Sequence, residues 1–285
     1  MTTAKNISRL PNGFDFHYLI EPEMQFIYQE IFSQNCYSHK LISYGNNETV
    51  IDIGGNIGLF LLFLCQQAET GRVFSYEPIP DIFRVHQQNV ELLQKKFPWD
   101  FQPRNCGVSH CVGEATFTYL PQCTARSSIY KEGSPADDTE EGRIREKRFT
   151  LQCFQHMPDR WTSKLLLWLP NFIRERITRN VMKLHAQSQE IKCQLTTISQ
   201  IIKDEQLETI DLLKVDAEGS EWDILQGVEA MDWPKIRQLA VELHPGPGDS
   251  TNRVPRLLLE HGYQIEVEQN PFFTDNPIVF ASRSK

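Results

Sequence analysis

From position 49 to position 282, short apolar runs alternate with longer stretches in which apolar residues recur every three or four positions. The short runs have the length of buried strands, and the longer stretches have the period of an amphipathic helix. Strands are predicted over residues 49–53, 72–76, 101–106, 114–119, 209–215, 237–243, 263–267 and 277–282. Helices are predicted over residues 57–67, 80–95, 196–203, 220–227 and 253–261. This alternation predicts an α/β fold, in which helices cover both faces of a mostly parallel sheet.

Two segments lie outside the alternation. Residues 1–48 contain one stretch with helical spacing, over residues 21–34, and are expected to form an N-terminal helical cap. Residues 121–190 interrupt the rhythm with a charged run and then an apolar, Trp-containing run. We expect an insertion here, which either packs on the edge of the domain or forms a lid. The predicted organisation is a cap over residues 1–48 and a main domain over residues 49–285.

Composition narrows the classes of partner. The formal net charge is −8, whereas a face that binds nucleic acid or an anionic membrane needs an excess of positive charge. None of the seven cysteines forms a CxxC pair, so neither a zinc knuckle nor a disulfide scaffold is indicated. No apolar run approaches the roughly 20 residues of a spanning helix. We therefore expect a cytoplasmic protein that binds neither nucleic acid nor membranes.

The stretch VIDIGGNIGLF, residues 50–60, is the first candidate for chemistry. It places Gly54, Gly55 and Gly58 between a predicted strand and a predicted helix. Glycines let a ligand approach the backbone closely, and the first turn of the helix offers unpaired N–H groups. The spacing, from Asp52 through Asn56, is neither the GxGxxG fingerprint of dinucleotide folds nor a Walker motif. The turn therefore predicts a nucleotide-like ligand without naming it.

The next strand ends in a second candidate, Glu77. A carboxylate at this place can accept hydrogen bonds from both hydroxyls of a ribose. The alternative is an acid that interacts with the start of the following helix. Together with the glycine turn, Glu77 predicts a nucleoside-containing cofactor, whose identity these two features leave open.

Acidic residues and a histidine follow the two later strands of the parallel set. Asp216 and Glu218 come directly after one strand, at the end where open α/β sheets bind ligands. Glu221 lies in the first turn of the next helix and is interpreted as a partner of the helix dipole. Glu242 and His244 alternate to one side of the next strand end. An unperturbed imidazole titrates near 6.5, so His244 is a candidate general base that a carboxylate would orient.

With these residues in place, the sequence resembles the FkbM-type methyltransferases, a branch of the class I enzymes that use S-adenosylmethionine (SAM). The resemblance extends from about residue 49 to residue 281, with a gap over residues 134–190, and its end looks like the O-methyltransferase domains of natural-product assembly lines. The insertion is longer than is common in the family, which leaves the substrate class open. The resemblance rests on VIDIGGNIGLF, FSYEPIPDIFRVHQQNV, NCGVSHCVGEATF, TTISQII, LLKVDAEGSEWDILQGV, LAVELH and HGYQIEVEQ.

The resemblance implies a seven-stranded, mostly parallel sheet with an antiparallel last strand and SAM over its carboxyl edge. The residues expected to bind the cofactor are Asp52, Gly54, Gly55, Asn56, Gly58, Glu77, Asn105 and Asp216. The residues expected near the substrate are Ser127, Ser128 and Glu242. His244 is expected to be the general base with Glu218 as its partner, and no metal is expected.

The expected reaction is in-line transfer of a methyl group to a hydroxyl oxygen of a polyketide or peptide intermediate, carried free or on a carrier protein. One alternative is a carboxylate or amine acceptor in peptide tailoring. Another is metal-assisted O-methylation with Asp216, Glu218 and His244 as ligands. A last alternative is a SAM-binding module that regulates a partner without chemistry. Aromatic residues of the insertion, Trp161, Trp168 and Phe172, form either an acyl-binding surface or a small core of their own.

Overall fold

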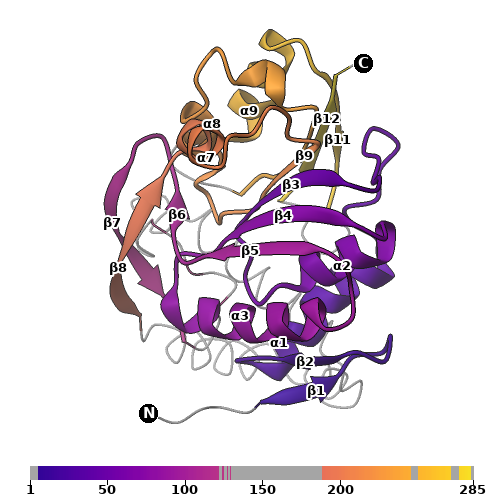
Figure 1. Cartoon of the computed structure of the whole chain (residues 1–285). Helices are drawn as coiled ribbons and strands as arrows, with labels where there is room; N and C mark the ends of the chain where they lie inside the picture. The colour runs from indigo at the N-terminus through magenta and orange to yellow at the C-terminus, as the bar shows by residue number, and fades with distance from the viewer. Residues whose placement is uncertain are drawn as a thin grey trace, which may run out of the picture.

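The computed structural model describes residues 6–121, 124, 127, 129, 188–244, 250–270 and 276–283. Its centre is a seven-stranded sheet in the order β11-β12-β10-β9-β3-β4-β5 (Figure 1). β12 runs antiparallel to both of its neighbours, and the other six strands share one direction. The strands are β3 (Glu48–Ile53), β4 (Gly71–Tyr76), β5 (Asp100–Arg104), β9 (Leu212–Val215), β10 (Gln238–Glu242), β11 (Gln264–Glu268) and β12 (Ile278–Ser282). The predicted α/β fold, with its antiparallel last strand, is confirmed.

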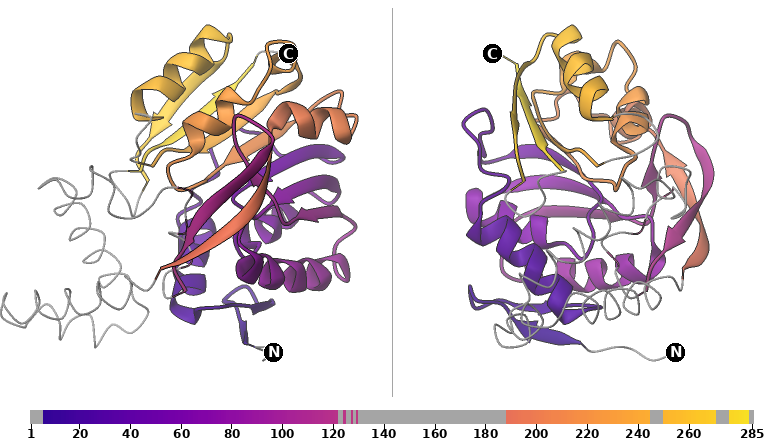
Figure 2. Two further views of the ribbon diagram at one scale, coloured as in Figure 1. Left: turned by 90° about the vertical axis from the view of Figure 1, so that its left-hand side faces the viewer. Right: turned by 180° about the vertical axis from the view of Figure 1, so that it is seen from behind.

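Two apolar layers cover the sheet because successive strand residues point to opposite faces. Val50 and Val73 belong to the layer formed with α1 (Glu21–Tyr28), α2 (Leu59–Gln67) and α3 (Pro80–Gln94). Ile51 and Phe74, one position further along their strands, belong to the opposite layer. That layer is completed by α7 (Ile198–Asp204), α8 (Glu221–Gln226) and α9 (Ser250–Glu260). Figures 1 and 2 show the two groups of helices on either side of the sheet.

The first helix after the glycine turn, α2, is apolar on every side. Its first seven residues, LFLLFLC, are all buried, so α2 cannot be a surface helix. The side away from the sheet is covered by aromatic residues of the N-terminal segment, with Tyr37 against Phe60 and Tyr44 against Phe63. The N-terminal segment therefore packs directly on the helix that begins at the glycine turn.

The N-terminal segment has a short hairpin and one bent helix. Strands β1 (Ile7–Arg9) and β2 (Asp15–His17) pair antiparallel. The helix predicted over residues 21–34 begins as α1 and continues as a π-helical turn, η1 (Gln29–Ser33), before Asn35 ends it at a positive φ of 53°. π-Helical turns occur frequently at functional sites. The division of the chain into a cap and a main domain stays a prediction.

A second, three-stranded sheet corrects the sequence analysis. β7 (Gly113–Tyr119) lies where a strand was predicted, but it pairs antiparallel with β8 (Gln189–Thr196) outside the main sheet. β6 (Gly107–Val108) pairs with the other edge of β8. No strand was predicted at β8, although Cys193 and Leu195 are buried on one face and the residues between are polar. The charged run and the apolar run of the expected insertion, with Trp161, Trp168 and Phe172, lie outside the described residues.

The described part of the chain contains no helix with both the length and the apolar character needed to cross a membrane.

Candidate active site

The turn between β3 and α2 is held in close contact with the turn after β9. Gly54 has a φ of 77°, and a Cβ built on it would lie 1.8 Å from the backbone oxygen of Asp216. A Cβ on Gly55 would lie 2.3 Å from Oγ of Ser75. Both backbone N–H groups donate to the carbonyl of Tyr76 at 3.0 Å. A side chain at Gly54 would push the two turns apart, and one at Gly55 would clash with Ser75 and His86, so both positions require glycine.

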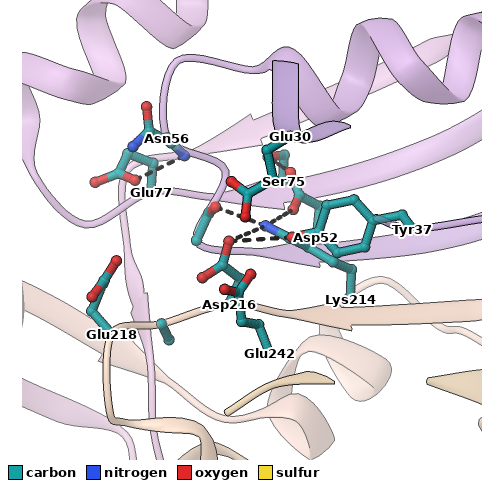
Figure 3. Close-up of polar contacts among 12 residues, drawn as sticks. Glu30, Tyr37, Asp52, Asn56, Ser75, Glu77, Lys214, Asp216, Glu218 and Glu242 are labelled. Carbon is teal, nitrogen blue, oxygen red and sulfur yellow. Dashed lines mark hydrogen bonds and ion pairs between the residues drawn. The ribbon is translucent and has the colours of Figure 1, made fainter. Parts of the chain in front are cut away.

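Glu77 lies beside the turn and is 5 % exposed. Its Oε2 accepts from the backbone N–H of Asn56 at 3.0 Å (Figure 3). Its Oε1 accepts from the backbone N–H of Ile79 at 2.9 Å. Asn105 donates from its side-chain amide to the carbonyls of Glu77 and Pro78, which fixes the end of β4. Burial raises the pKa of Glu77 to about 7, against the lowering effect of the two N–H donors. The structure thus brings the glycine turn, Glu77 and Asn105 together.

Asp52 takes a different place from the one expected. It is fully buried beneath the turn, where its Oδ2 accepts from the hydroxyl of Ser75 at 2.7 Å. Its Oδ1 lies 3.2 Å from Nζ of Lys214. Because both oxygens face the interior, Asp52 supports the turn from below and does not present its carboxylate to a ligand.

Lys214 is a buried cation that the sequence analysis missed. Its Nζ donates to the carbonyl of Gly54 at 3.0 Å and lies 3.5 Å from Oδ2 of Asp216. Burial lowers the pKa of Lys214, but Asp52 and Asp216 outweigh this and raise it above its ordinary value. The ammonium therefore stays charged and offsets two carboxylates (Figure 3). A lysine inside the apolar strand LLKV was the available signal.

Two polar side chains of α3 brace the turn from the other side. His86, which is fully buried, has Nδ1 2.9 Å from the carbonyl of Asn56. Asn89, three residues further along the helix, donates to the carbonyl of Ile57 at 2.8 Å. Burial lowers the pKa of His86, so its neutral ring donates from Nδ1. Polar residues with helical spacing on the buried face of α3 were a signal for this role.

Four acidic side chains, Asp216 among them, surround His244, which follows β10 and is 7 % exposed. Its Nδ1 lies 2.9 Å from Oε1 of Glu221, a fully buried carboxylate. Its Nε2 lies 3.8 Å from Oε2 of Glu218 and 3.9 Å from Oε1 of Glu242. The same nitrogen lies 4.0 Å from Oδ1 of Asp216. The residues predicted at this edge of the sheet therefore do meet around the imidazole.

The partner that orients His244 is Glu221, and the prediction that Glu218 holds this position is wrong. Glu221 is the first residue of α8, and its Oε1 also accepts from the backbone N–H groups of Ala217 and Gly219. These bonds turn its carboxylate inward, toward the end of β10. Glu218, at a positive φ of 49°, faces Nε2 instead. The position of Glu221 at the start of α8 explains its bonds to the backbone N–H groups of Ala217 and Gly219. The contact of Glu221 with His244 depends on the tertiary fold.

The charge on His244 also differs from the expectation. Burial lowers its pKa, but Glu218, Glu221 and Glu242 outweigh burial and raise the pKa well above the ordinary value of 6.5. The surrounding carboxylates therefore favour the protonated imidazole over the neutral ring that a general base needs.

The expected substrate residues have unequal support. Glu242 is buried, and its Oε1 accepts from Asn270, whose side-chain amide also donates to Glu30 of η1 at 2.6 Å. Burial raises the pKa of Glu242 well above its ordinary value. Oγ of Ser127 accepts from the backbone N–H of Leu120 at 3.2 Å. Ser128 lies outside the described residues, and substrate contact by any of these side chains stays a prediction.

A sheet in this strand order, with a glycine turn after β3 and an acidic end to β4, defines a Rossmann-like class I methyltransferase. The chain belongs to the FkbM methyltransferase family, since the sequence profile described as the Methyltransferase FkbM domain matches residues 52–265. Its cofactor is accordingly SAM. The residues fit this group: the carboxylate of Glu77 lies beside the glycine turn and can accept its ribose hydroxyls.

Three relatives illustrate the range of the family. The chain is 29% identical over 282 residues to the 31-O-demethyl-FK506 methyltransferase FkbM of Streptomyces tacrolimicus, covering 98% of this chain and 96% of that protein. It is 25% identical to the methyltransferase sdnD of Sordaria araneosa, covering 92% of this chain and 90% of that protein. It is 27% identical to the AMB antimetabolite synthetase AmbE of Pseudomonas aeruginosa, covering 92% of this chain and 12% of the synthetase.

Solved structures of lower similarity include the precorrin-6y C5,15-methyltransferase of Geobacter metallireducens, at 10% identity and a TM-score of 0.42, covering 99% of this chain and 96% of that one. Another is Aeropyrum pernix fibrillarin with bound SAM, at 10% identity and a TM-score of 0.39, covering 98% of this chain and 83% of that one.

Proposed function

We propose that this methyltransferase transfers the methyl group of SAM to a hydroxyl oxygen of a natural-product intermediate. The observation that carries the proposal is the oriented imidazole of His244 at the sheet edge that also holds the glycine turn. The name of the FK506 relative, a 31-O-demethyl-FK506 methyltransferase, supports an oxygen acceptor. A hydroxyl needs help to lose its proton, and a polarising group beside it supplies that help.

The acceptor is a small molecule, a polyketide or a peptide, either free or attached to a carrier protein. The relative AmbE is a synthetase, and the region of it that is similar to this chain makes up 12% of its length. This supports an acceptor attached to a carrier. The name of the FK506 relative gives 31-O-demethyl-FK506 as the acceptor of that protein, which supports a free acceptor. The cofactor would supply an electrophilic methyl group, and the chain aligns the acceptor with it.

Two forms of hydroxyl activation use His244. In the form expected from the sequence, His244 is the general base: Glu221 accepts the proton on Nδ1, which leaves Nε2 to take the proton of the hydroxyl. In the second form, a cation between His244, Asp216 and Glu218 activates the hydroxyl. The three carboxylate oxygens 3.8–4.0 Å from Nε2 favour the second form, because they attract positive charge to the place where a base needs an open lone pair.

The test is the variant His244→Ala with a panel of hydroxylated, amine and carboxylate acceptors. We expect turnover with a hydroxyl acceptor to fall roughly 10²–10⁴-fold while SAM affinity stays within about twofold, since activation of the hydroxyl is lost and the cofactor contacts are kept. Product structure by NMR and SAM titration by calorimetry give the two readouts. Unchanged turnover in the variant, or methylation of amines and carboxylates alone, would show that the acceptor is not a hydroxyl activated at His244.

A further inference from the structure

We propose that Asp216, Glu218 and His244 bind a divalent metal ion at the acceptor side of the site. Metal binding stands on the geometry of these three side chains alone. The role that we assign to the ion is activation of the acceptor hydroxyl. This role rests on the proposed O-methylation and makes the ion the group that activates the hydroxyl.

The ligand atoms of Asp216 and Glu218 lie at about the separation from Nε2 of His244 that one ion requires. One atom from each of the three side chains lies within 4.8 Å of the other two, and Nε2 of His244 is 3.8 Å from Glu218 and 4.0 Å from Asp216. Atoms that bind one ion at about 2.1 Å lie roughly 3–4 Å apart. Side-chain shifts of a few tenths of an ångström would therefore complete the set.

The imidazole is held as a metal ligand usually is. Metal-binding histidines commonly donate their other ring N–H to a carboxylate, which fixes the tautomer and the direction of the ring. Glu221 accepts from Nδ1 of His244 at 2.9 Å and is itself fully buried. Among the described residues, no hydrogen-bond acceptor lies within bonding distance of Nε2, although the side chain is only 9 % exposed. A buried nitrogen is thus directed at carboxylate oxygens that it does not reach.

The carboxylate of Asp216 is also held by protein contacts, so that one of its oxygens is directed at His244. Its Oδ2 accepts from the hydroxyl of Tyr37 at 3.3 Å and lies 3.5 Å from Nζ of Lys214. Its Oδ1 is the oxygen that faces His244. The contacts on Oδ2 hold the carboxylate in place and leave Oδ1 directed at the centre of the group. Figure 3 shows Asp216 and Glu218 on the same side of the loop after β9, with Lys214 beyond Asp216.

The charge and the donor types define the class of ion. Lys214 is shared between Asp52 and Asp216, and three carboxylates face Nε2, so a dication is better matched to this group than a monovalent ion. Two carboxylate oxygens and one imidazole nitrogen suit Mn²⁺, Fe²⁺, Co²⁺ or Zn²⁺, whereas Mg²⁺ and Ca²⁺ prefer oxygen alone.

Three protein ligands leave positions for the acceptor oxygen. A hydroxyl bound there has a lower pKa and releases its proton to solvent. The new O–C bond forms as the C–S bond of SAM breaks, and the sulfur keeps the electron pair. In this arrangement His244 acts as a ligand through Nε2, while Glu221 holds its Nδ1.

The test is direct titration of the EDTA-treated whole chain with Mn²⁺, without cofactor or acceptor, followed by electron paramagnetic resonance and calorimetry. We expect one saturable Mn²⁺ site per chain, displaced by Zn²⁺. Glu218→Gln and His244→Gln should weaken Mn²⁺ binding at least tenfold, because each removes one ligand. The matched control is Glu260→Gln, an exposed acid on α9 that should leave binding unchanged. Circular dichroism of every variant shows whether it folds.

The outcomes separate the two proposals. Absence of saturable binding in the wild type, or equal binding in folded Glu218→Gln and His244→Gln, overturns the metal site. Hydroxyl methylation that survives EDTA then leaves the proposed function standing. Saturable Mn²⁺ binding without methylation of any hydroxyl acceptor supports the metal site and overturns the proposed function.

Discussion

At the scale of the residue, one ammonium group decides whether the acidic site is stable. Lys214 is 3 % exposed and contacts Asp52, Asp216 and the carbonyl of Gly54. Buried charges are tolerated when they are paired, and removal of one partner leaves the other uncompensated. The contribution of Lys214 is therefore far larger than that of an exposed ion pair.

Lys214→Met should lower the free energy of unfolding by about 3–5 kcal/mol, because Asp52 would be left buried without a cation. The control is Lys192→Met, whose Nζ lies 3.3 Å from exposed Glu114, and which should change stability by less than about 1 kcal/mol. Urea denaturation of both variants measures the difference. Equal effects would mean that the buried ammonium contributes no more than a surface pair.

Glu77 gives the site a dependence on pH. Burial raises its pKa from 4.5 to about 7, so between these values the folded chain holds a proton that the unfolded chain releases. Stability therefore falls as pH rises through this window, by on the order of 3 kcal/mol in total for a shift of this size. Glu77→Gln, which does not titrate, should lose less stability than the wild type between pH 5 and pH 7.5.

The measurement is denaturant unfolding of wild type and Glu77→Gln across that range. The same variant should weaken SAM binding about 10–100-fold at pH 8, where the carboxylate is ionised, because hydrogen bonds to a charged acceptor are lost. Parallel stability curves for the two proteins would contradict the pKa assigned to Glu77.

At the scale of the element, the sequence predicts the positions of strand ends and turns better than it predicts the contacts between them. The alternating pattern predicted the order of strands and helices, because periods of 2 and of about 3.6 are local properties. β8 was missed because it adjoins a segment with no clear rhythm. Lys214 and His86 were missed as site residues, and Glu221 was missed as the partner of His244, because each depends on a contact with a distant element.

The glycine turn provides a test at this scale. Gly54→Ala should destabilise the chain and abolish detectable SAM binding, because its Cβ would meet the backbone oxygen of Asp216 at 1.8 Å and its φ is 77°. Gly113→Ala is the matched control, since nothing lies within 4 Å of a Cβ there. Thermal unfolding and SAM titration distinguish them. A Gly54→Ala variant that binds SAM normally would show that the two turns can separate freely.

At the scale of the whole molecule, the N-terminal segment is joined to the site it covers. Tyr37 donates to Asp216, and Glu30 of η1 accepts from Asn270, which also donates to Glu242. The same segment covers α2, whose apolar residues would otherwise face water. The cap predicted from the sequence over residues 1–48 thus contributes residues to the site as well as cover.

A chain that lacks residues 1–47 should fail to unfold cooperatively and should aggregate, because it exposes the apolar surface of α2. Differential scanning calorimetry and light scattering of the truncated and whole chains measure this. A soluble truncated chain with a sharp transition and intact SAM binding would show that the methyltransferase domain is independent of the cap.

The contact between the two turns has a consequence for how ligands act together. Lys214 bridges the carbonyl of Gly54, on the cofactor side, and the carboxylate of Asp216, on the acceptor side. A displacement of either turn is therefore transmitted to the other through one side chain and one van der Waals contact. Since we propose the cofactor at the glycine turn and the acceptor beside Asp216, we expect binding on the two sides to be cooperative, and by thermodynamic reciprocity each ligand should change the affinity of the other by the same factor.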